Sequence, residues 1–187
     1  TAVMLAMLAA TAPARGRAVR RSPRTGRSDA CAVLTGCVMD GLFGHVHEAT
    51  EVALEANGVH VQPAAGQVCC GALAAHAGDV AQAKALAREN VRAFDAAAPG
   101  LPVVVNSAGC GAALKSYGTL LADDPLADAA AAFSARVRDV SEVLAERGPR
   151  PGGPLALRVA YDAPCHLLHA QRVADAPLRL LAAIPGL

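Results

Sequence analysis

The sequence predicts an α/β fold in which a mostly parallel sheet is flanked by helices. Two observations support a folded domain of this class: the alternation of segments along the chain and the composition. Short apolar, β-branched runs alternate with longer alanine-rich stretches of helical periodicity along residues 31–187. The chain has 187 residues, of which 53% are hydrophobic and 18% charged. That composition suits one well-buried domain with a further fraction, and it excludes a disordered protein. No apolar run reaches the roughly eighteen residues that a membrane span needs.

Four segments are predicted to be strands because they are short, apolar and bounded by Gly, Pro or Cys: 32–35, 59–62, 103–106 and 157–161. Helical periodicity predicts helices over 44–57, 80–98, 112–121, a stretch from Pro125, and 138–147. Asp79 is expected to cap the second helix, which Pro99 and Gly100 end. Strands and helices that alternate in this way form parallel sheets with right-handed crossovers.

Cysteines follow the predicted strands. Cys37, the Cys69-Cys70 pair, Cys110 and Cys165 each come within a few residues of a strand end. Because parallel strands point their carboxyl ends to one edge of a sheet, where ligand sites form, we expect these thiols to gather there. Cys31 is expected to be a buried apolar side chain in or beside the first strand.

Disulfides, zinc and an iron–sulfur cluster are the three chemistries that use clustered thiols. Disulfide frameworks are typical of small secreted domains with weak cores, and zinc sites usually have closely spaced cysteine pairs that are absent here. An iron–sulfur cluster takes thiolates, typically four, from separated loops. Cys37, Cys69, Cys70 and Cys110 make four. Glycines flank Cys37, the Cys69-Cys70 pair and Cys110, and they permit close backbone approach to a bulky inorganic group; those glycines are Gly36, Gly71, Gly109 and Gly111.

The cysteine layout resembles the cysteine-rich CCG domain of heterodisulfide reductase B-type subunits and of iron–sulfur subunits of respiratory dehydrogenases. The flanking sequence is most similar to the iron–sulfur subunit of glycolate oxidase, or glycolate dehydrogenase. The resembling stretches are LTGCVMDGLFGHVHEAT, GQVCCGALAAHAGD, VVVNSAGCGAALKSYGTLLADDP, ARVRDVSEVLA and VAYDAPCHLLHAQRV. The resemblance implies that Cys37, Cys69, Cys70 and Cys110 bind iron.

The chain also departs from the family pattern. The family's C-x-x-C has Ser107 in its first position here, which favours a four-thiolate cluster, expected to be of the 4Fe–4S type, over a five-thiolate one. Cys165 resembles the first metal ligand of a second repeat. The expected organisation is a basic linker over 1–30, a first cysteine-rich repeat over 31–150 and the start of a second, truncated repeat over 151–187. On this interpretation the chain is an internal fragment.

The resemblance implies an electron-transfer subunit without a substrate site of its own. Its partners would be a flavin-containing dehydrogenase subunit and a further subunit or a quinone at the membrane. The implied location is cytoplasmic, or peripheral on the inner face of the cell membrane. Two alternatives stay open: a heterodisulfide-reductase-like catalyst and a structural zinc-binding α/β module. No G-x-G-x-x-G follows a strand, so no flavin site is expected in this chain.

Charge and histidine placement complete the expectations. Residues 1–30 contain six arginines against one acidic residue, and we interpret them as a linker, with a signal peptide or a phosphate-binding arm as the alternatives. Only 3% of residues are aromatic, which argues against stacking on nucleic-acid bases. Surface positions on helices are expected for His45, His47, Lys115 and Tyr117, whereas a site role is considered for His76 and His166.

Overall fold

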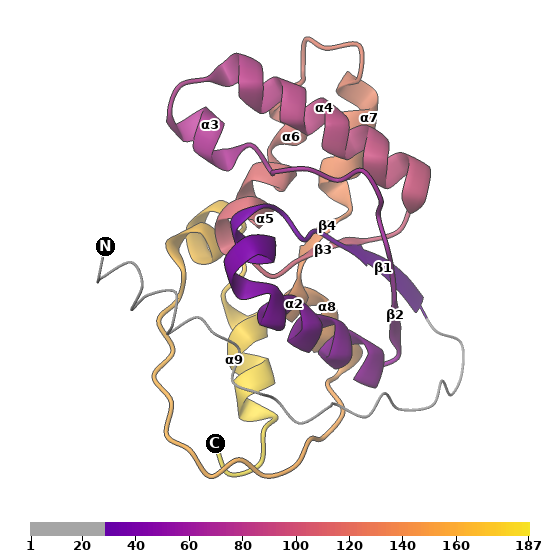
Figure 1. Cartoon of the computed structure of the whole chain (residues 1–187). Helices are drawn as coiled ribbons and strands as arrows, with labels where there is room; N and C mark the ends of the chain where they lie inside the picture. Colours follow the sequence, from indigo (N-terminus) through magenta and orange to yellow (C-terminus); the bar gives the residue numbers. More distant parts are fainter. Residues whose placement is uncertain (1–28) are drawn as a thin grey trace.

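The computed structural model describes residues 29–187, so nearly all of the predicted basic linker lies outside the described residues. Four parallel strands form a single sheet in the order β2-β1-β3-β4 (Figure 1). Their bounds are Asp29–Val33 for β1, Val59–Gln62 for β2, Val103–Val105 for β3 and Val137–Asp139 for β4. The α/β fold class with a parallel sheet flanked by helices is therefore confirmed.

Helices cover both faces of this sheet (Figure 1). One group packs on the face that carries the larger core: α3 Ala72–His76, α4 Val80–Ala97, α5 Ala108–Lys115, α6 Tyr117–Leu120 and α7 Ala127–Ala135. The other face is covered by α2 Val38–Ala56, α8 Val140–Arg147 and α9 Asp175–Ala182. A single π-helical turn, η1 His166–Ala170, precedes α9 and packs against α5.

Alternation of side chains along the two central strands builds both cores. In β1, Ala32 faces the core under α4 and α7, whereas Cys31 and Val33 face the core under α2 and α8. In β3, Val103 and Val105 face the first core and Val104 faces the second. Central strands that are buried on both faces read as continuous apolar runs, which is why these two segments were recognisable in the sequence. Cys31 is only 1% exposed, so its predicted place in the core is confirmed.

The strand order places a topological switch point between β1 and β3. From β1 the chain crosses to β2 on one side, and after β2 it returns to β3 on the other side of β1. The connections that leave β1 and β3 therefore run over opposite faces of the sheet, and a crevice opens beyond the carboxyl ends of these two strands. Cys37 follows β1 and Cys110 follows β3, so both cysteines lie at this crevice.

Two strand predictions need correction. The segment 157–161 forms no strand: residues 151–162 are exposed and have no regular secondary structure. The fourth strand is instead β4, in a place where the sequence predicted the first turn of a helix. It has three residues with Arg138 in the middle, and Asp139 then caps α8 through a capping box with Glu142. The first strand also begins at Asp29 rather than at residue 32, because its early residues pair with β2 through the backbone.

The other elements agree more closely with the sequence. The strand predicted over 59–62 is β2, and the helix predicted over 80–98 is α4, with Asp79 accepting a hydrogen bond from Gln82 N at its start. The helix predicted over 112–121 is two shorter helices, α5 and α6. The helix predicted over 44–57 is the part of α2 that follows a kink at Phe43, whose φ of −126° and ψ of 29° are not helical. Among residues 29–187, no helix combines the length and the apolar character needed to cross a membrane.

Candidate metal centre

Four thiols from three segments of the chain meet in two pairs at the carboxyl edge of the sheet. The Sγ atoms of Cys37 and Cys69 lie 3.3 Å apart, and those of Cys70 and Cys110 lie 3.2 Å apart. These segments follow β1, β2 and β3, as the sequence predicted for these four cysteines, and Cys110 lies in the first turn of α5. Cys37 is exposed and Cys70 is buried, so the two pairs extend from the surface inward.

The local backbone explains how adjacent cysteines reach different partners. Neighbouring side chains in an extended segment point to opposite sides, so Cys69 turns toward Cys37 while Cys70 turns toward Cys110. Gly71 follows with φ of 76°, a left-handed conformation that reverses the chain into α3. A Cβ at this position would also lie 3.4 Å from the backbone of Ala83. Glycine is therefore required by the turn that follows the cysteine pair.

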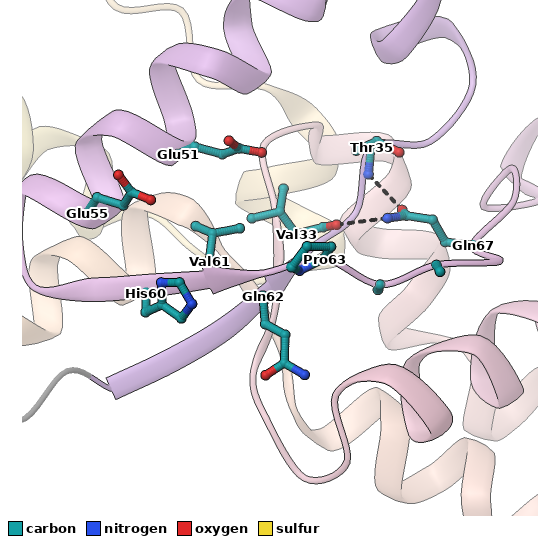
Figure 2. A pocket seen from close by; sticks show the side chains of 11 residues that line it. Val33, Thr35, Glu51, Glu55, His60, Val61, Gln62, Pro63 and Gln67 are labelled. Carbon is teal, nitrogen blue, oxygen red and sulfur yellow. Dashed lines mark hydrogen bonds between the residues drawn. The ribbon is translucent and has the colours of Figure 1, made fainter. Parts of the chain in front are cut away.

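Gln67 ties the loop of Cys69 to the loop of Cys37. Its side-chain Oε1 accepts a hydrogen bond from Thr35 N at 2.8 Å, and its Nε2 donates to Val33 O at 3.2 Å, as Figure 2 shows. The side-chain amide of Gln67 thus makes the two hydrogen bonds that a backbone residue of a neighbouring strand would make at the end of β1. Because Gln67 and Thr35 each lie two residues before a cysteine, this contact aligns Cys69 with Cys37.

Asn90 and Tyr117 hold the backbone of the cysteine pair from the opposite side. Asn90 Nδ2 donates to Cys69 O at 3.0 Å and to the Tyr117 hydroxyl at 3.1 Å, and Asn90 Oδ1 accepts from Val68 N at 2.9 Å. The Tyr117 hydroxyl donates to Cys70 O at 2.9 Å. Tyr117 is 1% exposed, so the prediction of a solvated helix position was wrong. Lys115 is partly exposed and pairs with Glu142 at 2.9 Å.

His47 links the ends of β1 and β3. Its Nε2 lies 2.8 Å from Thr35 O and its Nδ1 lies 3.1 Å from Asn106 Nδ2. A carbonyl can only accept and an amide NH₂ can only donate, so the neutral tautomer has its proton on Nε2. His47 is 6% exposed, and its predicted surface position was therefore wrong. The signal was available in the sequence, since His47, Thr50 and Leu54 share the buried face of α2.

Hydrogen bonding within the pairs shifts the thiol pKa values. Cys37 donates to Cys69, and this bond, together with burial, raises the pKa of Cys37. Cys70 donates to Cys110, so the pKa of Cys70 is raised, and the hydrogen bond received by Cys110 lowers its pKa to about 6. Ser107 also hydrogen-bonds to Cys110 and lowers its pKa, whereas burial of Cys110 acts in the opposite direction. Cys110 is thus the thiol best prepared to become a thiolate, the form that binds metals.

Two of the four predicted glycines lie in α5, the helix that carries Cys110. A Cβ on Gly109 would meet nothing within 4 Å, whereas a Cβ on Gly111 would overlap the side-chain amide of Gln171. Gln171 follows η1, is 7% exposed and donates to Ala108 O at 2.9 Å. The lack of a side chain at Gly111 therefore leaves room for Gln171 of the C-terminal segment. Packing does not explain the glycine at Gly109. Gly36, before Cys37, has φ of 67°, which favours glycine.

Cys165 belongs to neither pair. It is exposed and begins the turn η1, which packs on α5. His166 is exposed as well, and its ring lies edge-on to that of His76 with centroids 6.0 Å apart. His76 ends α3, the helix that follows the cysteine pair. The two histidines considered for a site role thus contact each other, and Cys165 as a metal ligand stays a prediction.

The chemistry of these four thiols fits an iron–sulfur cluster. Four thiols come from three separate segments of the chain, each pair combines a more exposed and a less exposed sulfur, and the Cys69-Cys70 backbone is fixed by buried side chains. Cluster ligation would replace the thiol hydrogen bond within each pair by two metal–sulfur bonds. Among the described residues, no three His, Cys, Asp or Glu side chains converge as they would around a single ion.

An open pocket of about 490 Å³ lies between α2 and β2 (Figure 2). Glu51 and Glu55 of α2 and His60 of β2 line it, and Gln67 forms part of its wall. None of the residues that line this pocket is a cysteine. Gln67 links this pocket to the thiol site, because it lines the pocket and also aligns the loops of Cys37 and Cys69.

Comparison with known proteins gives a family match and several relatives. The profile of the family described as "Cysteine-rich domain", CCG, matches residues 31–115. The probable glycolate oxidase iron-sulfur subunit of Bacillus subtilis is 38% identical over 160 residues, which cover 83% of this chain and 36% of the relative. The glycolate oxidase iron-sulfur subunit of Escherichia coli is 36% identical over 148 residues, covering 75% of this chain and 36% of the relative.

A third relative is lactate utilization protein A of Geobacillus kaustophilus, 34% identical over 154 residues that cover 81% of this chain and 63% of the relative. The chain thus spans about a third of the length of the two glycolate oxidase subunits. No solved structure matches the chain.

Proposed function

We propose that the protein is an iron–sulfur subunit of an oxidoreductase that acts on a 2-hydroxy acid. The match of residues 31–115 to the cysteine-rich CCG domain family supports this proposal. The observation that carries the proposal is the meeting of Cys37, Cys69, Cys70 and Cys110 in two thiol pairs at the switch point of the sheet. The names of the relatives, which include two glycolate oxidase iron-sulfur subunits and a lactate utilization protein, support the oxidoreductase class.

The proposed metal ligands are these four cysteines, and the proposed group is a 4Fe–4S cluster. When bound, such a cluster accepts and releases one electron at a time. The chain would hold it between a buried sulfur, Cys70, and an exposed one, Cys37. An electron would thus enter or leave near Cys37, while the Cys70 end stays shielded from water by the core. Cys165 is proposed as a ligand of a separate group, since it belongs to neither pair.

Ser107 occupies the place of a fifth cysteine and hydrogen-bonds to Cys110. A hydroxyl there can donate to a ligand sulfur but is a weak iron ligand compared with a thiolate. This substitution favours electron relay over the alternative of a heterodisulfide-reductase-like catalyst. The substrate would then be oxidised elsewhere, by a flavin-containing subunit, and the acceptor would be a further subunit or a quinone.

The test is to purify the tagged chain without oxygen, after co-expression with a candidate flavoprotein 2-hydroxy-acid dehydrogenase. We expect the flavoprotein to co-purify and glycolate or lactate to bleach the brown iron–sulfur absorbance. Cys70→Ser should abolish the bleaching while the flavin is still reduced. Reduction of a disulfide substrate by the loaded protein, with no response to hydroxy acids, would instead favour the heterodisulfide-reductase-like alternative.

A further inference from the structure

Both peptide groups around Cys70 have a fixed orientation. Cys69 O accepts from Asn90, and Cys70 O accepts from Tyr117. The described peptide bonds contain no cis form, and in a trans peptide the C=O and the N–H point in opposite directions. The N–H groups of Cys70 and Gly71 therefore point away from Asn90 and Tyr117. The Cys70 sulfur also accepts a hydrogen bond from the backbone of Ala72, which places a further N–H on the sulfur side.

The two side chains that set this orientation are themselves immobilised. Asn90 is 0% exposed, and both its amide atoms are hydrogen-bonded. The Tyr117 ring stacks on Phe133 with centroids 5.5 Å apart, and its hydroxyl both donates and accepts. A buried polar network whose members are all satisfied is rigid, because any rotation leaves an unpaired group away from water.

We propose that Asn90 and Tyr117 are positioning residues of the thiol site, which hold the Cys69-Cys70-Gly71 backbone so that adjacent thiols reach separate partners and peptide N–H groups face the sulfurs. Neither side chain contacts a sulfur in the hydrogen bonds described above. Their effect passes through the backbone. Hydrogen bonds from peptide N–H groups to ligand sulfurs raise the reduction potential of an iron–sulfur cluster, since they stabilise the more negative, reduced state. That last consequence rests on the proposed function.

Tyr117→Phe is the sharpest variant because it keeps the ring and its stacking and removes only the hydroxyl. Asn90→Ala removes the side-chain amide that bonds to Cys69 O, Val68 N and the Tyr117 hydroxyl. Tyr161→Phe is the matched control, since Tyr161 is 38% exposed and lies in the segment without secondary structure. Cys31 serves as an internal reference: it is a buried thiol in the second core, with its pKa raised to about 11 by burial.

The first measurement uses the full chain without metal and follows the alkylation rate of each cysteine by mass spectrometry. We expect Cys70 to be alkylated roughly tenfold faster in Tyr117→Phe and in Asn90→Ala, because local opening becomes easier when buried hydrogen bonds are lost. The rate at Cys31 should stay unchanged, and Tyr161→Phe should match the unmodified protein. An unchanged Cys70 rate, or an equal acceleration at Cys31, would overturn the proposal.

The second measurement uses the protein reconstituted anaerobically with iron and sulfide. Tyr117→Phe should shift the midpoint potential to lower values and alter the electron paramagnetic resonance line shape, at unchanged iron content. An unmodified protein that binds no cluster contradicts the proposed function, while the alkylation rates still decide whether these residues position the thiols. A cluster with the same potential and line shape in all variants contradicts the positioning of the peptide N–H groups and leaves the proposed function intact.

Discussion

The sulfur of Cys70 donates a hydrogen bond to the sulfur of Cys110 at 3.2 Å, although forty positions of the chain separate the two residues. The helices α3 and α4 and the strand β3 lie between them, so their meeting depends on the part of the crossover that returns the chain to the sheet. A change that weakens this part of the fold is therefore expected to weaken the thiol site as well.

Replacement of single thiols should separate ligands from core cysteines. Cys110→Ser is expected to reduce the iron and sulfide content of the reconstituted protein to a small fraction, because a serine hydroxyl binds iron less well than a thiolate. Cys31→Ala is the control: it should keep the iron and lower the unfolding free energy by about 1 kcal/mol, since it removes a buried apolar group. Equal iron content in the two variants would exclude Cys110 as a ligand.

Gln67→Ala tests the alignment of the first two loops. The variant leaves Thr35 N and Val33 O without their side-chain partner, and we expect a loss of about 1–3 kcal/mol in unfolding free energy by urea titration. Gln82→Ala removes the same side chain from an exposed position on α4 and should change stability by less than about 0.5 kcal/mol. Similar losses in both variants would show that the contact does not tie the loops together.

Gly111 and Gly109 provide a matched pair on one helix. Gly111→Ala must displace Gln171, and a loss of about 1–3 kcal/mol is expected from overpacking. Gly109→Ala meets no neighbour and should be neutral or stabilising by about 0.5–1 kcal/mol through helix propensity. In a double-mutant cycle, Gln171→Ala should recover most of the loss of Gly111→Ala. Additive effects would mean that the two residues do not compete for the same space.

Local sequence patterns predicted some of the strands and helices, whereas other segments depend on which neighbouring strand they can pair with. The segment 59–62 and the helix capped by Asp79 were predicted because turn residues and an apolar stripe mark them within the sequence. The segment 157–161 has the same apolar character, yet it forms no strand, because a strand also needs a neighbour with which to exchange hydrogen bonds. Three-residue β4 carries too few residues to show any alternation.

Some residues of the candidate site could likewise be predicted from the sequence, and others could not. The cysteines were recognisable because the end of a parallel strand is a fixed place in the fold. Gln67 and Asn90 were missed because a single amide side chain has no pattern of its own. Asn90 could have been found by its position, since it lies on the buried face of α4 with Ala83, Ala87 and Phe94. A polar residue on an apolar stripe indicates a buried hydrogen-bond network.

The ion pair between Arg88 and Asp124 should make stability depend on pH. The Arg88 hydrogen bond lowers the pKa of Asp124 below its value of 3.8 in an unfolded chain. The native state therefore binds fewer protons than the unfolded state, and the stabilisation is fully present above pH 3.8 and lost as the pH falls through the lower native pKa.

Asp124→Asn is thus expected to be less stable than the unmodified chain at pH 7, with a difference that shrinks below about pH 4. Thermal unfolding of the metal-free protein across this range measures the effect. Asp123→Asn, at the exposed neighbouring position, should show no such trend. A difference between Asp124→Asn and the unmodified chain that is constant with pH would exclude the ion pair as its source.

The central claim is that four thiols from the segments that follow β1, β2 and β3 bind one iron–sulfur cluster. The most direct measurement is the iron and acid-labile sulfide content per chain after anaerobic reconstitution, combined with electron paramagnetic resonance of the reduced protein. We predict a brown protein with iron and sulfide in near-equal amounts, about four of each as in a 4Fe–4S cluster held by four cysteines, and a signal that is lost in Cys70→Ser. A colourless protein that holds only zinc, or iron that persists in Cys70→Ser, would contradict the claim.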